Sequence, residues 1–69
     1  MAAQIFVNGE AYPLSQTSIS LVELLTLLQL PKERLAIEKN GQLIPRQQHL
    51  ETTIHDGDQL EIVHFVGGG

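Results

Sequence analysis

The chain has 69 residues, with eight acidic and four basic side chains, a formal net charge of −4 and no cysteine. A chain of this length forms one small domain that cannot easily enclose a substrate, which favours a carrier or binding module over an enzyme. The four scattered basic residues argue against nucleic-acid binding, and the lack of cysteine excludes disulfides, Cys-ligated metal sites and a thiol nucleophile.

The N-terminal part of the chain predicts a hairpin. The apolar run Gln4–Val7 is typical of a strand, and Asn8-Gly9 is a strong signal for a two-residue turn because both residue types tolerate positive φ. Glu10–Leu14 would return beside it. Pro13 has no backbone N–H to donate, so we expect this strand at the edge of a sheet. Ser15–Ser18 reads as a polar linker.

The segment from Ser20 to Leu30 predicts the only helix. Ser20 and Glu23 have the spacing of a capping box, in which each side chain can satisfy a free amide of the first turn. Pro31 is expected to end the helix. Apolar side chains at i, i+3, i+4 and i+7 form the stripe that would face the core: Leu21, Leu24, Leu25 and Leu28.

A second hairpin is predicted in the middle of the chain. Leu35–Lys39 and Gln42–Ile44 are apolar-rich runs that flank another turn signal, Asn40-Gly41. Residues 46–55 are polar and are expected to be irregular, with a short 3₁₀ turn around Gln47–Leu50.

The chain finishes with a turn, a strand and glycines. Asp56-Gly57-Asp58 predicts a tight turn, and Leu60–Val66 predicts the last strand. Three glycines in a row, Gly67–Gly69, lose much conformational freedom on ordering, so folding alone does not favour them. Extended, they span about 10 Å. We interpret them as a flexible stalk that presents the terminal carboxylate to another protein, with a frayed chain end as the alternative.

The order of these elements predicts the fold class. A hairpin, a helix, a second hairpin and a final strand indicate an α+β protein in which one helix covers a mixed sheet of four to five strands. This is the β-grasp, or ubiquitin-like, plan, with the first and last strands at the centre. We expect a domain over residues 1–66 and a tail over residues 67–69.

Alternation along the strands predicts which residues face the helix. A carboxylate is not expected to lie unpaired in the core, so Glu61 marks the outer face. Leu60 and Ile62, with Ile5 and Val7, would then face the helix. The outward apolar residues would form one patch beside the tail, which we interpret as a docking surface together with Val66: Phe6, Val63 and Phe65. Shielding by sheet twist and self-association are the alternatives.

Motifs of catalysis or metal binding are missing from the sequence. His49, His55 and His64 lack the spacing of zinc ligands. They are expected to be surface polar residues, with His64 alternatively at the flank of the sheet. Asp56 and Asp58 are better explained as turn residues than as a general acid and base. Membrane-span and signal-peptide patterns are also missing, so a cytoplasmic location is expected.

Several segments together resemble one family, the ThiS sulfur carrier proteins of thiamine biosynthesis. The terminal Gly-Gly alone is less specific, because ubiquitin and the small subunits of molybdopterin synthase share it. His49 departs from the pattern, since many members of the family have an aromatic or apolar residue there. The resemblance covers essentially the whole chain and rests on Val7–Glu10, Ser20–Leu25, Ala36–Gly41, Ile44–Arg46, Asp56–Val63 and Phe65–Gly69.

The resemblance implies a protein cosubstrate that is not itself an enzyme. A ThiF-like adenylyltransferase would use MgATP to adenylate the carboxylate of Gly69, reached through Gly67 and Gly68. Sulfur from a cysteine desulfurase or a related donor would then give a thiocarboxylate, which thiazole synthase consumes. The protein would bind no cofactor of its own. The alternatives are a carrier for molybdopterin synthesis or tRNA thiolation, a ubiquitin-like modifier, and an interaction domain with an inert tail.

Overall fold

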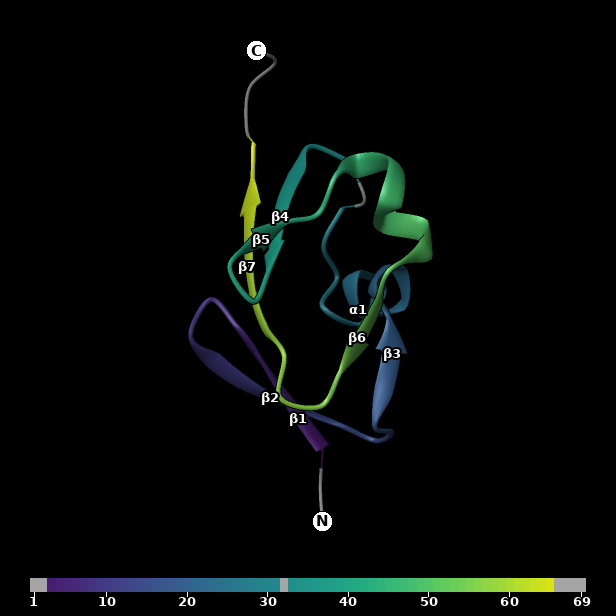
Figure 1. The fold of residues 1–69 in the computed structure, drawn as a ribbon, viewed down its shortest axis with the longest axis vertical. Coiled ribbons are helices and arrows are strands. Elements are labelled where there is room, and N and C mark those ends of the chain that lie inside the picture. Colours follow the sequence, from purple (N-terminus) through teal and green to yellow (C-terminus); the bar gives the residue numbers. More distant parts are fainter. Residues whose placement is uncertain (1–2, 32, 66–69) are drawn as a thin grey trace.

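A mixed five-stranded sheet with one helix on one side forms the body of the protein (Figure 1). The computed structural model describes residues 3–31 and 33–65. Strands β1 and β7 run parallel at the centre of the sheet, and the other neighbours are antiparallel. In spatial order the strands are β2 (Glu10–Leu14), β1 (Ala3–Val7), β7 (Gln59–His64), β4 (Leu35–Lys39) and β5 (Gln42–Leu43). This confirms the β-grasp prediction and the edge position of Pro13.

Both Asn-Gly pairs form the predicted two-residue turns. Asn8 and Gly9 have φ of 51° and 86°, and Asn40 and Gly41 have φ of 53° and 85°. Positive φ at both central residues matches the right-handed twist of the flanking strands, which is why this turn closes tight hairpins. The turns set the registers Val7↔Glu10 and Lys39↔Gln42.

The helix α1 (Leu21–Leu27) starts where predicted and ends earlier. At its start the Oγ of Ser20 accepts the backbone N–H of Glu23 at 3.1 Å. At its end Gln29 adopts a left-handed φ of 59°, so the chain turns away before Pro31. The N–H of Gln29 donates to Thr26 O at 3.0 Å and that of Leu30 donates to Leu25 O at 2.9 Å. These two bonds form a Schellman motif, with glutamine at the position usually taken by glycine.

A second, two-stranded sheet was not expected from the sequence. Strands β3 (Ser18–Ser20) and β6 (Thr53–His55) pair antiparallel. β3 begins at the end of the predicted linker, and β6 lies in the segment that was expected to be irregular. Each strand contributes one apolar residue, Ile19 opposite Ile54, and Ile54 is fully buried. This burial explains why such short polar segments pair. The 3₁₀ helix η1 (Arg46–Glu51) forms around the predicted turn.

The core lies between the large sheet and α1, and β3, β6 and η1 lie on the same side as the helix (Figure 1). Within the described part of the chain no helix is long and apolar enough to cross a membrane. The predicted inward faces are confirmed, because all four residues are buried: Ile5, Val7, Leu60 and Ile62.

His49 is buried, which corrects the prediction that it lies at the surface. Its exposed fraction is 8%, and its Nε2 lies 3.1 Å from the carbonyl oxygen of Ile44. The 3₁₀ helix after Pro45 turns the ring back toward the core. Because imidazole is an aromatic ring with polar atoms at its edge, it can pack there while hydrogen bonding to the backbone.

Candidate functional site

Strand β7 is the element that leads to the C-terminal glycines. β4 pairs with it from Leu35↔His64 to Lys39↔Leu60, and the N–H of Phe65 donates to Arg34 O at 2.8 Å, which extends the ladder. Pairing with β1 is shorter and covers only Gln59 and Leu60. The predicted tail, Gly67–Gly69, and the docking residue Val66 lie outside the described residues.

The side chain of Asn8 takes over where β1 stops pairing with β7. Its Oδ1 accepts the N–H of Ile62 at 2.9 Å, and its Nδ2 donates to Ile62 O at 3.1 Å. Its own backbone N–H donates to Leu60 O at 2.9 Å. The side-chain amide of Asn8 therefore takes the place of a neighbouring strand residue. It pairs with the N–H and C=O of Ile62, which β1 does not reach.

The other turn holds the start of β7 in a similar way. The Oδ1 of Asn40 accepts the N–H of Gln59, and its Nδ2 donates to Asp58 Oδ1, both at 3.0 Å. Asp58 Oδ2 also accepts the N–H of His55 at 2.8 Å. Partial burial by itself raises the pKa of Asp58. The hydrogen bonds from His55 and Asn40, together with the nearby charges of Lys39 and His55, outweigh it and lower the pKa below its ordinary value.

The carboxylates of Asp56 and Asp58 accept hydrogen bonds from backbone N–H groups around their turn, as expected of turn residues. Asp56 Oδ1 accepts the N–H of Gln4 at 2.9 Å, and Gly57, with φ of 88°, donates its N–H to Gln4 O at 2.7 Å. Among the residues that the structure describes, no group of three or more His, Cys, Asp or Glu side chains could hold a metal ion.

An exposed apolar surface lies on the outer face of the sheet at the C-terminal end of β7. Val63 is 57% exposed and Phe65 is 53% exposed, as the alternation predicted. Ala36 lies opposite Val63 on β4. Leu43 of β5, which is 65% exposed, lies one row further along, opposite Glu38.

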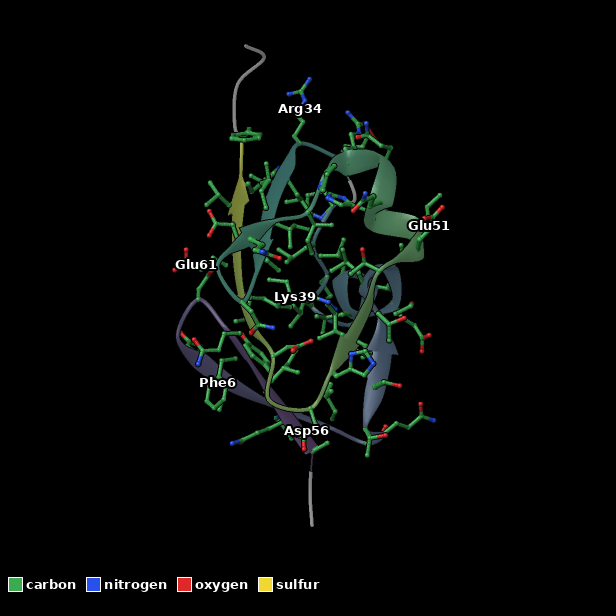
Figure 2. All side chains as sticks on the ribbon, viewed as in Figure 1. Phe6, Arg34, Lys39, Glu51, Asp56 and Glu61 are labelled. Carbon is green, nitrogen blue, oxygen red and sulfur yellow. The ribbon has the colours of Figure 1, made fainter. Side chains whose placement is uncertain are left out.

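Phe6 does not belong to this surface, so the single predicted patch is wrong in extent. Phe6 is half-buried and lies opposite Gln59 of β7. Gln59 precedes Phe65 by six residues, which separates Phe6 from Phe65 by about 20 Å along the strand. Figure 2 shows Phe6 and Arg34 toward opposite ends of the molecule. The carbonyl oxygen of Arg34 accepts the N–H of Phe65, so Phe65 lies at the Arg34 end. Phe6 instead lines a shallow pocket of about 310 Å³ with Gly9, Gln59, Leu60 and Glu61.

Sequence reasoning missed Leu43 and the direct pairing of Glu38 with Glu61 across β4 and β7. A signal for Leu43 was present, because a two-residue turn at Asn40-Gly41 forces Glu38 to face Leu43. The register between β4 and β7 had no such local signal.

The fold defines a ubiquitin-like, β-grasp domain, and in the sequence its central strand β7 is followed by three glycines. The ThiS family model matches residues 4–69. The chain belongs to the ThiS family.

Individual relatives agree with this assignment. The sulfur carrier protein ThiS of Bacillus subtilis is 33% identical over 63 residues, which cover 91% of this chain and 96% of that protein. The crystal structure of the thiamine biosynthesis protein ThiS from Geobacter metallireducens superposes with a TM-score of 0.81 at 34% identity, covering 96% of this chain and 99% of that one.

A longer relative contains a similar segment. The thiazole synthase of Paramagnetospirillum magneticum is 35% identical over 66 residues, which cover 96% of this chain. The chain spans only 20% of the length of that relative.

Proposed function

We propose that the protein is a sulfur carrier for thiamine biosynthesis and that it carries sulfur as a thiocarboxylate on Gly69. The observation that carries the proposal is the family match, which runs from residue 4 through Gly69 and so includes the glycines. The exposed surface at Val63 and Phe65, where β7 leads toward those glycines, supports docking of a partner that receives them.

The chemistry on Gly69 needs an activating partner. A carboxylate is a poor electrophile because it lacks a good leaving group. Attack of the Gly69 carboxylate on the α-phosphate of ATP forms the acyl-adenylate and releases pyrophosphate. A sulfur nucleophile then displaces AMP, so that one carboxylate oxygen leaves with AMP and sulfur takes its place. ATP and Mg²⁺ belong to a ThiF-like adenylyltransferase, and the carrier acts as its cosubstrate.

The sulfur has to come from another protein or a small donor. The chain has no cysteine, so it cannot hold a persulfide or a thiol of its own. A cysteine desulfurase or a related donor fills this role in the proposal. If the donor delivers a persulfide, its terminal sulfur displaces AMP to give an acyl disulfide, and a thiol of a partner protein or a small-molecule reductant then cleaves the S–S bond, leaving the thiocarboxylate on Gly69 and a disulfide on the thiol side. Thiazole synthase is the acceptor, and relatives that carry this name and contain a ThiS-like segment support that choice.

Docking compensates for threading the tail into the activating enzyme. Burial of an exposed Val or Phe side chain contributes about 1.5–3 kcal/mol. Binding energy from Val63 and Phe65, and from Val66, which follows in the sequence, can therefore offset the ordering of the glycines and position the carboxylate for attack. Glycines at 67, 68 and 69 allow the chain to enter a narrow channel, because no Cβ is present to collide with its walls.

Intact-mass measurement tests the proposal. The protein, incubated with adenylyltransferase, MgATP and a sulfur source, should gain the mass difference of one oxygen-to-sulfur exchange, and thiazole synthase should remove it. Consumption by the large subunit of molybdopterin synthase instead would move the protein to that pathway. Isopeptide-linked adducts in cells would identify a modifier, and full function after deletion of the glycines would identify an inert tail.

A further inference from the structure

The outer face of β7 and β4 carries an ordered sequence of charge and apolar groups. Arg34 lies at the end of the sheet, beside Phe65. The apolar residues Phe65, Val63 and Ala36 follow. Glu61 and Glu38 lie in the next row, directly opposite each other. We call this arrangement the charged strip, and it is defined by these six residues.

The two glutamates of the charged strip are unfavourable in the free protein. Both are exposed, and like charges directly opposite each other in an antiparallel pair destabilise a sheet. The neighbouring cation does not relieve them. Lys39 lies opposite Leu60 on the other face, with its Nζ 3.5 Å from the carbonyl oxygen of Thr53. In the described part of the chain, neither carboxylate makes a hydrogen bond that would stabilise the fold.

Arg34 is also a residue that folding does not favour at its position. Its φ is 59°, a left-handed conformation in which glycine would be less strained. Its side chain projects beyond the end of the sheet (Figure 2). Along β4 it is four residues from Glu38, about 13 Å. Opposite charges therefore flank the apolar part of the strip.

We propose that the charged strip fixes the orientation in which the activating adenylyltransferase docks. The inference rests on the proposed function, because the occupant is the enzyme that receives the glycines. Its docking surface presents an arginine or lysine to Glu38 and Glu61, apolar side chains to Val63 and Phe65, and a carboxylate to Arg34. Reversed docking would place like charges together, so only one orientation is favourable, and that orientation directs the C-terminal segment to the ATP site.

Matched charge reversals on two faces test this proposal. Glu61→Lys changes the strip, and Glu51→Lys makes the same change of charge on η1, on the other side of the molecule (Figure 2). Association with the adenylyltransferase is measured by stopped flow at low and high salt. We expect Glu61→Lys to slow association about tenfold at low salt. The difference should shrink at 1 M salt, where the screening length is about 3 Å.

Stability measurements separate docking from folding. Glu61→Lys turns a repulsive pair with Glu38 into an attractive one, so its melting temperature should rise while its association slows. Arg34→Gly should likewise stabilise the domain and weaken docking. An unchanged association rate for Glu61→Lys, or equal slowing by Glu51→Lys, would overturn the charged-strip proposal.

The proposed function is read out separately in the same samples. Pyrophosphate release at saturating wild-type carrier reports adenylation whatever the orientation mechanism. If the wild type is adenylated but Glu61→Lys leaves the association rate unchanged, the charged-strip proposal is refuted and the proposed carrier function stands. Absence of pyrophosphate release from the wild type would refute the carrier function and the strip together.

Discussion

Asn8 and Ile62 are 54 residues apart, yet the side-chain amide of Asn8 bonds to both the N–H and the carbonyl of Ile62, at 2.9 and 3.1 Å. One asparagine thus has two roles. Its backbone forms the turn between β1 and β2, and its side chain extends the pairing of β7 beyond Leu60. The strand that leads to the glycines is held from both sides through Ile62, although β1 itself pairs with it over two residues only.

Asn8→Gly should separate these two roles. Glycine keeps the positive φ but removes both bonds to Ile62, at a net loss of about 1–2 kcal/mol in the free energy of unfolding. Urea unfolding measures the loss, and amide hydrogen exchange should accelerate at Ile62 relative to Ile37 in the core. Unchanged protection at Ile62 would show that the amide does not hold the strand.

Gln29→Gly should stabilise the protein. Gln29 occupies the left-handed position of the Schellman motif with φ of 59°, where glycine carries no steric penalty. We expect the free energy of unfolding to rise by about 0.5–1 kcal/mol, since relief of strain exceeds the extra chain entropy of glycine. Gln29→Ala keeps the strain and is the matched control. A less stable glycine variant would contradict the assigned helix end.

The lowered pKa of Asp58 should make the free energy of unfolding depend on pH in the acid range. Its pKa is lowered in the folded state from the ordinary 3.8, so the folded protein favours the charged carboxylate. Its contribution is fully present above that ordinary value and is lost as the pH falls through the lower, folded pKa. Asp58→Asn should therefore be less stable than wild type at pH 6, and in urea titrations the difference should shrink as the pH falls below 3.8.

Removal of one partner of Asp58 tests the cause of that pKa shift. Asn40→Gly preserves the turn backbone but deletes the amide bond to Asp58 Oδ1, so the carboxyl pKa should move upward. Titration of the Asp58 side-chain carbon by NMR measures it. A pKa that stays put would show that the Asn40 amide does not contribute to the shift, leaving the His55 N–H and the nearby positive charges as its cause.

Phe65 and Phe6 should differ in their effect on docking. Phe65→Asp places a charge in the exposed surface at the end of β7. It should weaken binding to the adenylyltransferase by about tenfold or more, from the roughly 1.5–3 kcal/mol of one buried side chain. Phe6→Asp, about 20 Å away along the sheet, should weaken it less. Isothermal titration with both folded variants compares them, and equal losses would restore a single continuous patch.

The terminal glycines should be needed for chemistry and not for folding. Gly68→Ala, or deletion of Gly69, should abolish pyrophosphate release while leaving the melting temperature at the wild-type value, because the added Cβ or the missing residue acts only inside the enzyme's channel. Adenylation of either variant at the wild-type rate would count against the proposed role of Gly69.

Local patterns in the sequence were enough for most of the fold. The Asn-Gly turns at residues 8 and 40 specify both hairpins, and the charge of Glu61 between Leu60 and Ile62 identifies the outer face of β7. Each of these signals acts within a few residues, where turn geometry and strand alternation determine the structure.

The errors concern interactions without a local signature. β3 and β6 each offer one isoleucine, and Ile19 and Ile54 pair only because the fold brings them together. Gln29 ends the helix in a conformation that its residue type does not indicate. The prediction placed Phe6 beside Phe65, whereas Phe6 lies opposite Gln59. The register of the parallel strands β1 and β7 depends on the whole chain segment that connects them, so no local pattern reveals it.

The central position of β7 also bears on how the protein is made. β7 follows β1 and β4 in the chain yet lies between them in the sheet, so a nascent chain that has not yet reached β7 has a gap in the middle of its sheet. A chain that lacks β7 therefore leaves β1 and β4 without the strand that joins them in the sheet. Closure of the sheet thus requires that translation has passed the strand that precedes the glycines.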